Sequence, residues 1–211
     1  MNRRVVLLVC LLALVVVWRF SRSSLQSSSA AAPLVPAIDG SRIFFVPIGT
    51  FPADELDPLV EYYRQKYSLE ITVARSVRLD ESSRDTARQQ FVAEKLISNL
   101  RAGLPKLGKD PKAILIGFTL EDMFTTSQNW QFTPGWRDPR SRTAVVSTAR
   151  LHLPSDDQAF AADIASTRLR KIVTKDIGLM YYGLTPSSDP KSVLYKQIAG
   201  VEQLDQAGDE F

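Results

Sequence analysis

The chain has 211 residues, of which 45% are hydrophobic and 23% charged, as is ordinary for a protein with one sizeable core. Its net charge of +3 comes from the first 40 residues, which carry four arginines and one acid, so the rest is neutral. The sequence pI of about 9.0 is therefore no argument for nucleic-acid binding, which needs a clustered basic face. Cys10 is the only cysteine and His152 the only histidine, which excludes an internal disulfide and a cysteine-based metal site.

Residues 5–18 form an unbroken apolar run, VVLLVCLLALVVVW, with arginines on both sides. As a helix this run would be about 21 Å long at about 1.5 Å per residue, which suits a signal peptide better than a full bilayer span of about 30 Å. Arg19 and Arg22, however, stand where a cleavage region should be small and neutral, and arginines can extend a short span by reaching the membrane surface. We therefore predict a single-pass anchor in residues 1–22, with cleavage of a signal peptide as the alternative.

Both interpretations export the following domain to the periplasmic or extracellular side if the Arg3 and Arg4 end stays inside. Residues 23–40 are rich in Ser, Ala and Pro, a composition typical of a flexible linker. The folded domain is expected over residues 41–211.

Hydrophobic patterning in this domain predicts strands that alternate with helices. Short apolar runs indicate strands, and apolar residues spaced i, i+3, i+4 and i+7 indicate helices. Strands are expected at 42–48, 69–74, 113–118 and 143–151, and helices at 54–67, 83–102, 156 to about 182, and after Ser192. Ser83 is the expected cap of the second helix. The order predicts one α/β domain whose mixed, mostly parallel sheet is joined by crossover helices.

Residues 168–195, RLRKIVTKDIGLMYYGLTPSSDPKSVLY, resemble the zinc helix and methionine turn of the metzincin proteases. In the family pattern H-E-x-x-H-x-x-G-x-x-H, histidines at i and i+4 bind zinc and the Glu acts as general base on the zinc-bound water. The Gly turns the chain so that the third His reaches the metal. Further segments are similar to the archaemetzincin group of bacteria: FVPIG at 45–49, ILIGFTLEDMF at 114–124, NWQFTPGW at 129–136 and AVVSTARL at 144–151.

The resemblance covers residues 42–205 and implies a metzincin-like domain, but the family's metal-binding positions carry other residues. They are Lys175 and Leu179 for the first two histidines, Asp176 for the glutamate and Thr185 for the third histidine. Leu194 stands in place of the methionine, and the turn glycine, Gly183, comes one position late. Lys175 would repel a metal ion and Leu179 has no donor atom. The zinc site is therefore predicted to be lost, with no metal ligand, no cofactor and no catalytic residue.

Two groups of residues nevertheless have a functional interpretation. The aromatic residues Trp130, Phe132, Trp136, Tyr182 and Tyr195 could form a peptide-binding groove, and the alternative is that the Trp130–Trp136 run covers the core. Lys175 and Asp176 could form a catalytic pair without metal, but adjacent side chains on a helix point about 100° apart.

The sequence thus favours a non-catalytic, metzincin-like pseudo-protease domain at the bacterial envelope, anchored in the membrane through residues 5–18. We expect it to bind a peptide or protein partner and no nucleic acid. Two alternatives stay open at this stage. One is an active archaemetzincin-type peptidase with atypical metal ligands or none, and the other is a purely structural role in an envelope complex.

Overall fold

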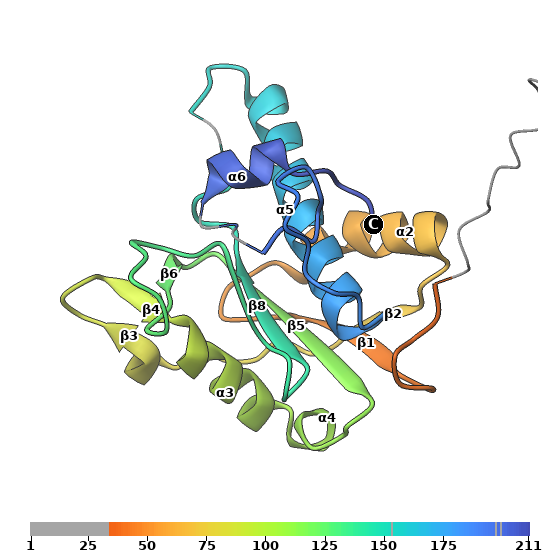
Figure 1. The fold of residues 1–211 in the computed structure, drawn as a ribbon. Coiled ribbons are helices and arrows are strands. Elements are labelled where there is room, and N and C mark those ends of the chain that lie inside the picture. Colours follow the sequence, from red (N-terminus) through yellow and green to blue (C-terminus); the bar gives the residue numbers. More distant parts are fainter. Residues whose placement is uncertain (1–33, 153, 197, 199) are drawn as a thin grey trace, which may run out of the picture. The chain divides into compact units, whose positions relative to one another are not determined.

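The computed structural model describes residues 34–152, 154–196, 198 and 200–211 (Figure 1). Val35–Phe211 form one compact unit. The apolar run at 5–18, on which the anchor prediction rests, lies outside the described residues. Among those that are described, no helix is long and apolar enough to cross a membrane.

The main sheet of this unit has five described strands in the order β2-β1-β5-β8-β7. They are β1 (Arg42–Pro47), β2 (Ile71–Val73), β5 (Ala113–Thr119), β7 (Gly135–Asp138) and β8 (Thr143–Ser147). Neighbouring strands are parallel except for β7, which runs antiparallel to β8 at one edge. The predicted mixed, mostly parallel sheet is therefore confirmed.

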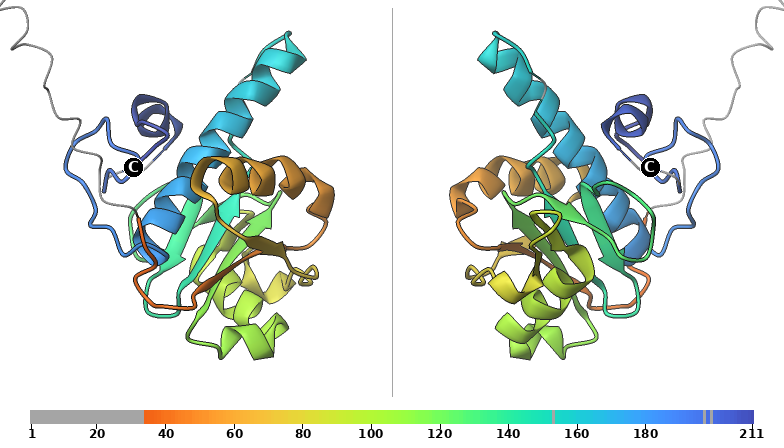
Figure 2. Two further views of the ribbon diagram at one scale, coloured as in Figure 1. Left: turned by 90° about the vertical axis from the view of Figure 1, so that its right-hand side faces the viewer. Right: turned by 90° about the vertical axis from the view of Figure 1, so that its left-hand side faces the viewer.

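Helices cover both faces of this sheet, as Figure 2 shows. One face packs against α2 (Asp57–Tyr67) and α5 (Gln158–Met180), and the other against α3 (Ala93–Gly103), which is followed by α4 (Pro105–Gly108). Alternate residues of β1 enter the two cores, with Phe45 on the α2 and α5 side and Val46 on the α3 side. Burial on both faces explains why β1 and β5 read as apolar runs without alternation.

The helix predicted at 83–102 is wrong in its first half, because α3 begins only at Ala93. The preceding residues form a 3-10 turn, η2 (Glu81–Ser83), and the strands β3 (Arg84–Asp85) and β4 (Gln90–Val92). The Asp85 carboxylate accepts hydrogen bonds from the backbone N–H groups of Ala87 and Arg88, at 2.9 and 3.0 Å, and so closes a turn that competes with a helix.

The prediction of a single sheet over 42–151 is also wrong. β4 pairs with β3 and with β6 (Met123–Phe124) in a second, three-stranded sheet of the described chain. This pairing buries Phe91 beside Met123, both of them at most 1% exposed. Phe91 also fits the helical spacing of its neighbours, which is why a helix was predicted. Its burial in this sheet stabilises the strand more than that spacing favours a helix.

Three smaller differences concern the ends of elements. β8 stops at Ser147 instead of residue 151, and the 3-10 turn η1 (Ala53–Leu56) precedes α2. The last helix, α6 (Val201–Gln206), begins later than the predicted position after Ser192. β7 was not predicted, because its half-buried residues have neither an apolar run nor a regular alternation.

Candidate functional site

The C-terminal half of α5 carries Lys175, Asp176 and Leu179, the positions predicted to correspond to the metzincin zinc helix. Asp157 caps the helix by accepting a hydrogen bond from the Phe160 N–H at 3.0 Å. After Met180 the chain turns at Gly183, whose φ of +66° is readily available only to glycine, and Leu184 N–H donates to the Gly178 carbonyl at 2.9 Å. The turn brings the chain back along α5.

Lys175 is only 5% exposed, and its ammonium donates a hydrogen bond to the Tyr195 carbonyl oxygen. This contact links α5 to residues 192–195, which stand where the metzincins have their methionine turn. Burial and, to a smaller extent, the Arg137 charge lower the pKa of Lys175 to about 8, against the opposing effect of the Asp176 charge. A cation is thus held by the protein backbone at the position predicted to correspond to the first zinc ligand.

Asp176, the next residue, is 1% exposed and pairs with Arg137 of β7, with 2.6 Å between Oδ1 and Nε. Its Oδ2 has no hydrogen-bond partner among the described residues. Burial raises the pKa of Asp176, while the Arg137 charge and hydrogen bond lower it. This carboxylate therefore forms a buried ion pair that joins α5 to the edge strand.

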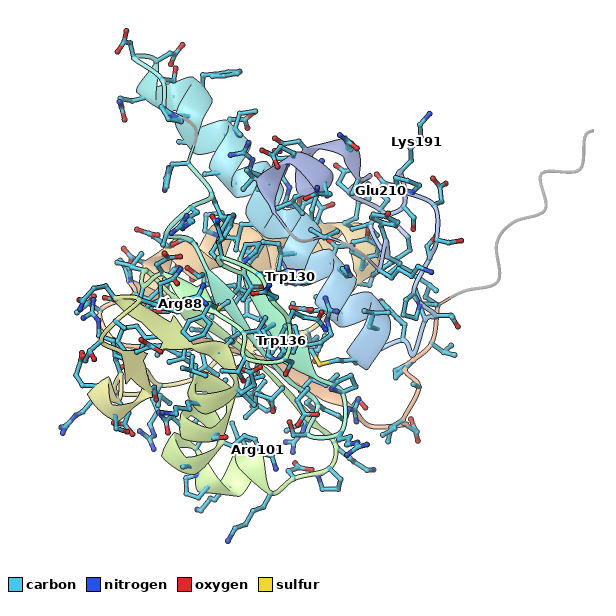
Figure 3. All side chains as sticks on the ribbon, turned by 60° about the vertical axis from the view of Figure 1, so that its left-hand side comes forward. Arg88, Arg101, Trp130, Trp136, Lys191 and Glu210 are labelled. Carbon is cyan, nitrogen blue, oxygen red and sulfur yellow. The ribbon has the colours of Figure 1, made fainter. Side chains whose placement is uncertain are left out.

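A cavity of about 620 Å³ lies beside Lys175 and Leu179, which both line it, as side chains at i and i+4 on one helix face do. Its other walls come from β7, from the segment before β7 and from the C-terminal loop. These residues are Gln128, Trp130, Gly135, Trp136, Arg137, Pro139, Leu184, Pro186, Lys196 and Ile198. Trp130 and Trp136 meet edge to face with ring centroids 6.5 Å apart, and both are labelled in Figure 3.

The remaining predicted site residues do not line this cavity. Thr185 is exposed in the loop between the lining residues Leu184 and Pro186. Phe132 lies under the Arg150 guanidinium, 4.5 Å from the ring centroid, and lines a separate hollow near α6. Tyr182 packs on Phe211 and on the α2 and α5 core, where burial raises its pKa to about 12. Tyr195 contributes its carbonyl oxygen to Lys175.

Sequence reasoning missed Arg137 and Lys196 as components of the site. Arg137 faces Asp176 because β7 pairs antiparallel with β8, and Lys196 comes to the cavity because the loop after Gly183 returns along α5. Neither residue belongs to a recognisable motif. The only sequence signal for these two residues was that Arg137 follows the segment 129–136 and Lys196 the segment 168–195, which both resemble the family.

The residues at the predicted metal-binding positions do not have the chemistry of zinc ligands. An ammonium group repels a cation, and the hydrocarbon side chain of Leu179 has no lone pair to donate. Among the described residues, no group of three His, Cys, Asp or Glu side chains could hold a metal ion. His152 lines a different cavity between α2 and α5.

Two more cations of α5 fasten the C-terminal segment to the helix. Arg168, 3% exposed, donates two hydrogen bonds to Asp205 at 2.8 and 2.6 Å and one to the Leu151 carbonyl at 2.7 Å. Lys171 donates to the Leu204 and Asp205 carbonyls at 3.0 and 3.2 Å. Arg168, Lys171 and Lys175 are spaced three and four residues apart and so share one side of the helix. This side of α5 therefore holds the C-terminal segment against the helix.

The arrangement of sheet, helices and returning loop is that of an archaemetzincin-like α/β domain. It superposes on the crystal structure of archaemetzincin from Methanopyrus kandleri with a TM-score of 0.63 and 22% identity, covering 83% of this chain and 92% of that one. The archaemetzincin from Archaeoglobus fulgidus, complexed with malonate, gives a TM-score of 0.61 at 19% identity, covering 81% and 94%. A zinc-dependent peptidase from Methanocorpusculum labreanum gives 0.60 at 18%, covering 80% and 95%.

Similarity in sequence points to the same group of proteins. Archaemetzincin of Halobacterium salinarum is 29% identical over 140 residues, which is 65% of this chain and 76% of the relative. Archaemetzincin of Haloquadratum walsbyi is 29% identical over 152 residues, covering 71% and 83%. No family model matches the chain. The archaemetzincin-like fold is thus established, and the archaemetzincins are its distant relatives.

Proposed function

We propose that this domain is a non-catalytic, archaemetzincin-like pseudo-protease that binds a peptide or protein partner at the cell envelope. The observation that carries the proposal is the buried ammonium of Lys175, at the first metal-binding position and hydrogen-bonded to the Tyr195 carbonyl. This contact joins the helix directly to the following turn. Leu179, at the second position, extends the apolar wall of the cavity.

Peptide binding is supported by what surrounds the former metal positions. β7 ends the order of the main sheet, and an edge strand can pair with an extended peptide through backbone groups alone. Trp136 lies on β7 and Trp130 packs against it, so the cavity beside this edge has an aromatic wall. A partner laid along β7 would place side chains in this cavity.

An active peptidase with atypical ligands or none is the alternative. It is favoured by the fold shared with the Methanocorpusculum labreanum protein, which is described as a zinc-dependent peptidase. The residues of this chain argue against it, because Lys175 and Leu179 replace two ligands and Asp176 pairs with Arg137. Transfer of activity from a shared fold is weaker evidence than the chemistry of the side chains.

Metal analysis distinguishes these two functions. The purified protein is expected to contain no stoichiometric zinc and to keep its melting temperature in EDTA, because a ligand that binds only the folded state would raise that temperature. Elemental analysis and thermal unfolding with and without chelator are the measurements. One equivalent of zinc, or peptide cleavage that EDTA abolishes, would establish the peptidase.

The converse variant carries Lys175→His, Asp176→Glu, Leu179→His and Thr185→His together. Restored ligands should give measurable zinc affinity in calorimetry, which the unmodified protein should lack. Gly183 lies one position late and Asp176 is engaged by Arg137, so the third histidine and the glutamate start from displaced positions. Orientation of ligands by their neighbours contributes to affinity, and the gain should therefore be modest.

We also propose that residues 5–18 anchor the chain in the membrane, with the domain exported. Full-length protein should remain with the membrane fraction after carbonate washing, because an uncleaved apolar run of this kind is not released by alkali. Immunoblotting of the fractions and sequencing of the mature N-terminus are the measurements. A soluble form that starts near Ala32 would show cleavage and secretion instead.

A further inference from the structure

The cavity beside α5 has a positively charged lining. Lys175, Lys196 and Arg137 all line it, and no acidic residue does among the described residues. Asp176 is the acid paired with one of these cations, and it holds only Nε of Arg137. Even with Asp176 ionised, the cluster keeps a net positive charge that a ligand can neutralise.

Two of the three cations are available to a ligand. Lys196 is exposed, and its ammonium forms no ion pair with any described residue. The Arg137 side chain is 25% exposed, and its Nη groups donate no hydrogen bond to a described residue. A guanidinium group presents several N–H donors in a plane, which matches the two oxygens of a carboxylate.

The other walls are apolar. Trp130, Trp136, Leu179, Leu184 and Ile198 line the same space as the cations. A volume of about 620 Å³ is within the usual range of roughly 300–1,000 Å³ for a site that encloses a small ligand. The cavity therefore combines anion-binding groups with room for a hydrophobic group next to them.

We infer that this cavity binds the C-terminal end of a peptide, with the terminal carboxylate at Lys196 and Arg137, beside the charge of Lys175, and an apolar last side chain against the two tryptophans. At a peptide C-terminus the carboxylate and the side chain are attached to the same Cα, so both parts of the lining are filled together. The inference rests on the proposed function, because a peptide paired along β7 would end in this cavity. The recognised group is the terminal carboxylate.

The test uses two matched pairs of probes and the full-length protein in detergent. The first pair is the acetylated peptide Gly-Gly-Gly-Ala-Phe with a free carboxylate or as its amide, and the second is hydrocinnamate or its amide. Binding is measured by calorimetry. We expect the free-carboxylate peptide to bind about tenfold or more tightly than the amide, the factor typical of losing a charged hydrogen bond. Lys196→Gln should remove most of this difference, whereas Lys191→Gln, an exposed lysine outside the cavity, should leave it unchanged.

The outcomes separate this inference from the proposed function. Equal affinity for peptide acid and peptide amide would overturn the carboxylate site and leave peptide binding in place. Binding of hydrocinnamate, lost in Lys196→Gln, with no binding of either peptide would support the carboxylate site and refute the peptide partner. If Lys196→Gln still preferred the free-carboxylate peptide to the amide by the same factor, the carboxylate would be recognised elsewhere. That result would overturn the inference.

Discussion

Replacing Arg137 by Gln is expected to lower the free energy of unfolding by about 3 kcal/mol, the lower end of the range for breaking a buried ion pair from one side. The loss arises because Asp176, 1% exposed, would keep a buried charge without its counterion. Asp176→Asn should cost less, since the partner left behind is 25% exposed and water can solvate it. The double variant should be more stable than Arg137→Gln alone.

The pH dependence of the Arg137→Gln variant follows from the same pair. Burial already raises the pKa of Asp176, and removal of Arg137 raises it further, above the pKa in the unfolded chain. Stability that depends on a raised carboxyl pKa is present at low pH and is lost as pH rises through the folded pKa. The variant should therefore be closer to wild type in acid than at neutral pH.

Urea unfolding in acid and at neutral pH measures the loss of stability and its pH dependence, with Arg140→Gln as the matched control. Arg140 is exposed in the turn between β7 and β8, so its loss should change stability little. If Arg137→Gln and Arg140→Gln had the same stability at neutral pH, the pair between β7 and α5 would contribute nothing.

Lys175→Met should change how stability depends on alkaline pH. In the folded protein the pKa of Lys175 is lowered from 10.5 to about 8, so between these values the unfolded chain binds more protons than the folded one. Stability of the wild-type protein should therefore rise with pH over this window relative to the Met variant. The relative gain is about 2 kcal/mol between about pH 7.5 and 9.5, from about 1.4 kcal/mol per pKa unit.

The comparison is made between Lys175→Met and wild type at each pH, because the tyrosines with raised pKa values are present in both proteins and their contributions cancel. Lys191→Met serves as control, since this lysine is exposed in the loop after α5 and should follow the wild-type curve. Parallel pH profiles for wild type and Lys175→Met would mean that the Lys175 ammonium is not destabilised by burial. The proposal that the buried Lys175 ammonium takes the place of a metal ion would then lose its main physical support.

Local patterns in the sequence were sufficient for the main elements. Each central strand is a short apolar run, and α2 and the second half of α5 present apolar residues at helical spacing, so these elements follow from which residues need burial. The residue types at 175, 176, 179 and 185 were equally readable, and their chemistry is the basis for predicting that the metal-binding positions are lost. In contrast, the predicted start of α3 at residue 83 was wrong, because the Asp85 turn and the burial of Phe91 outweighed helical spacing.

The contacts that define the site depended on the tertiary structure. Arg137 and Asp176 are 39 residues apart, and Lys175 and the Tyr195 carbonyl are 20 apart, so no local periodicity could pair them. The antiparallel β7 brings the first pair together, and the turn at Gly183 brings the second. The sequence by itself therefore determined which ligands the chain could not provide. Only the packing of α5 between the edge strand and the returning loop decided what replaced them, because a buried charge takes its partner from whatever the fold places beside it.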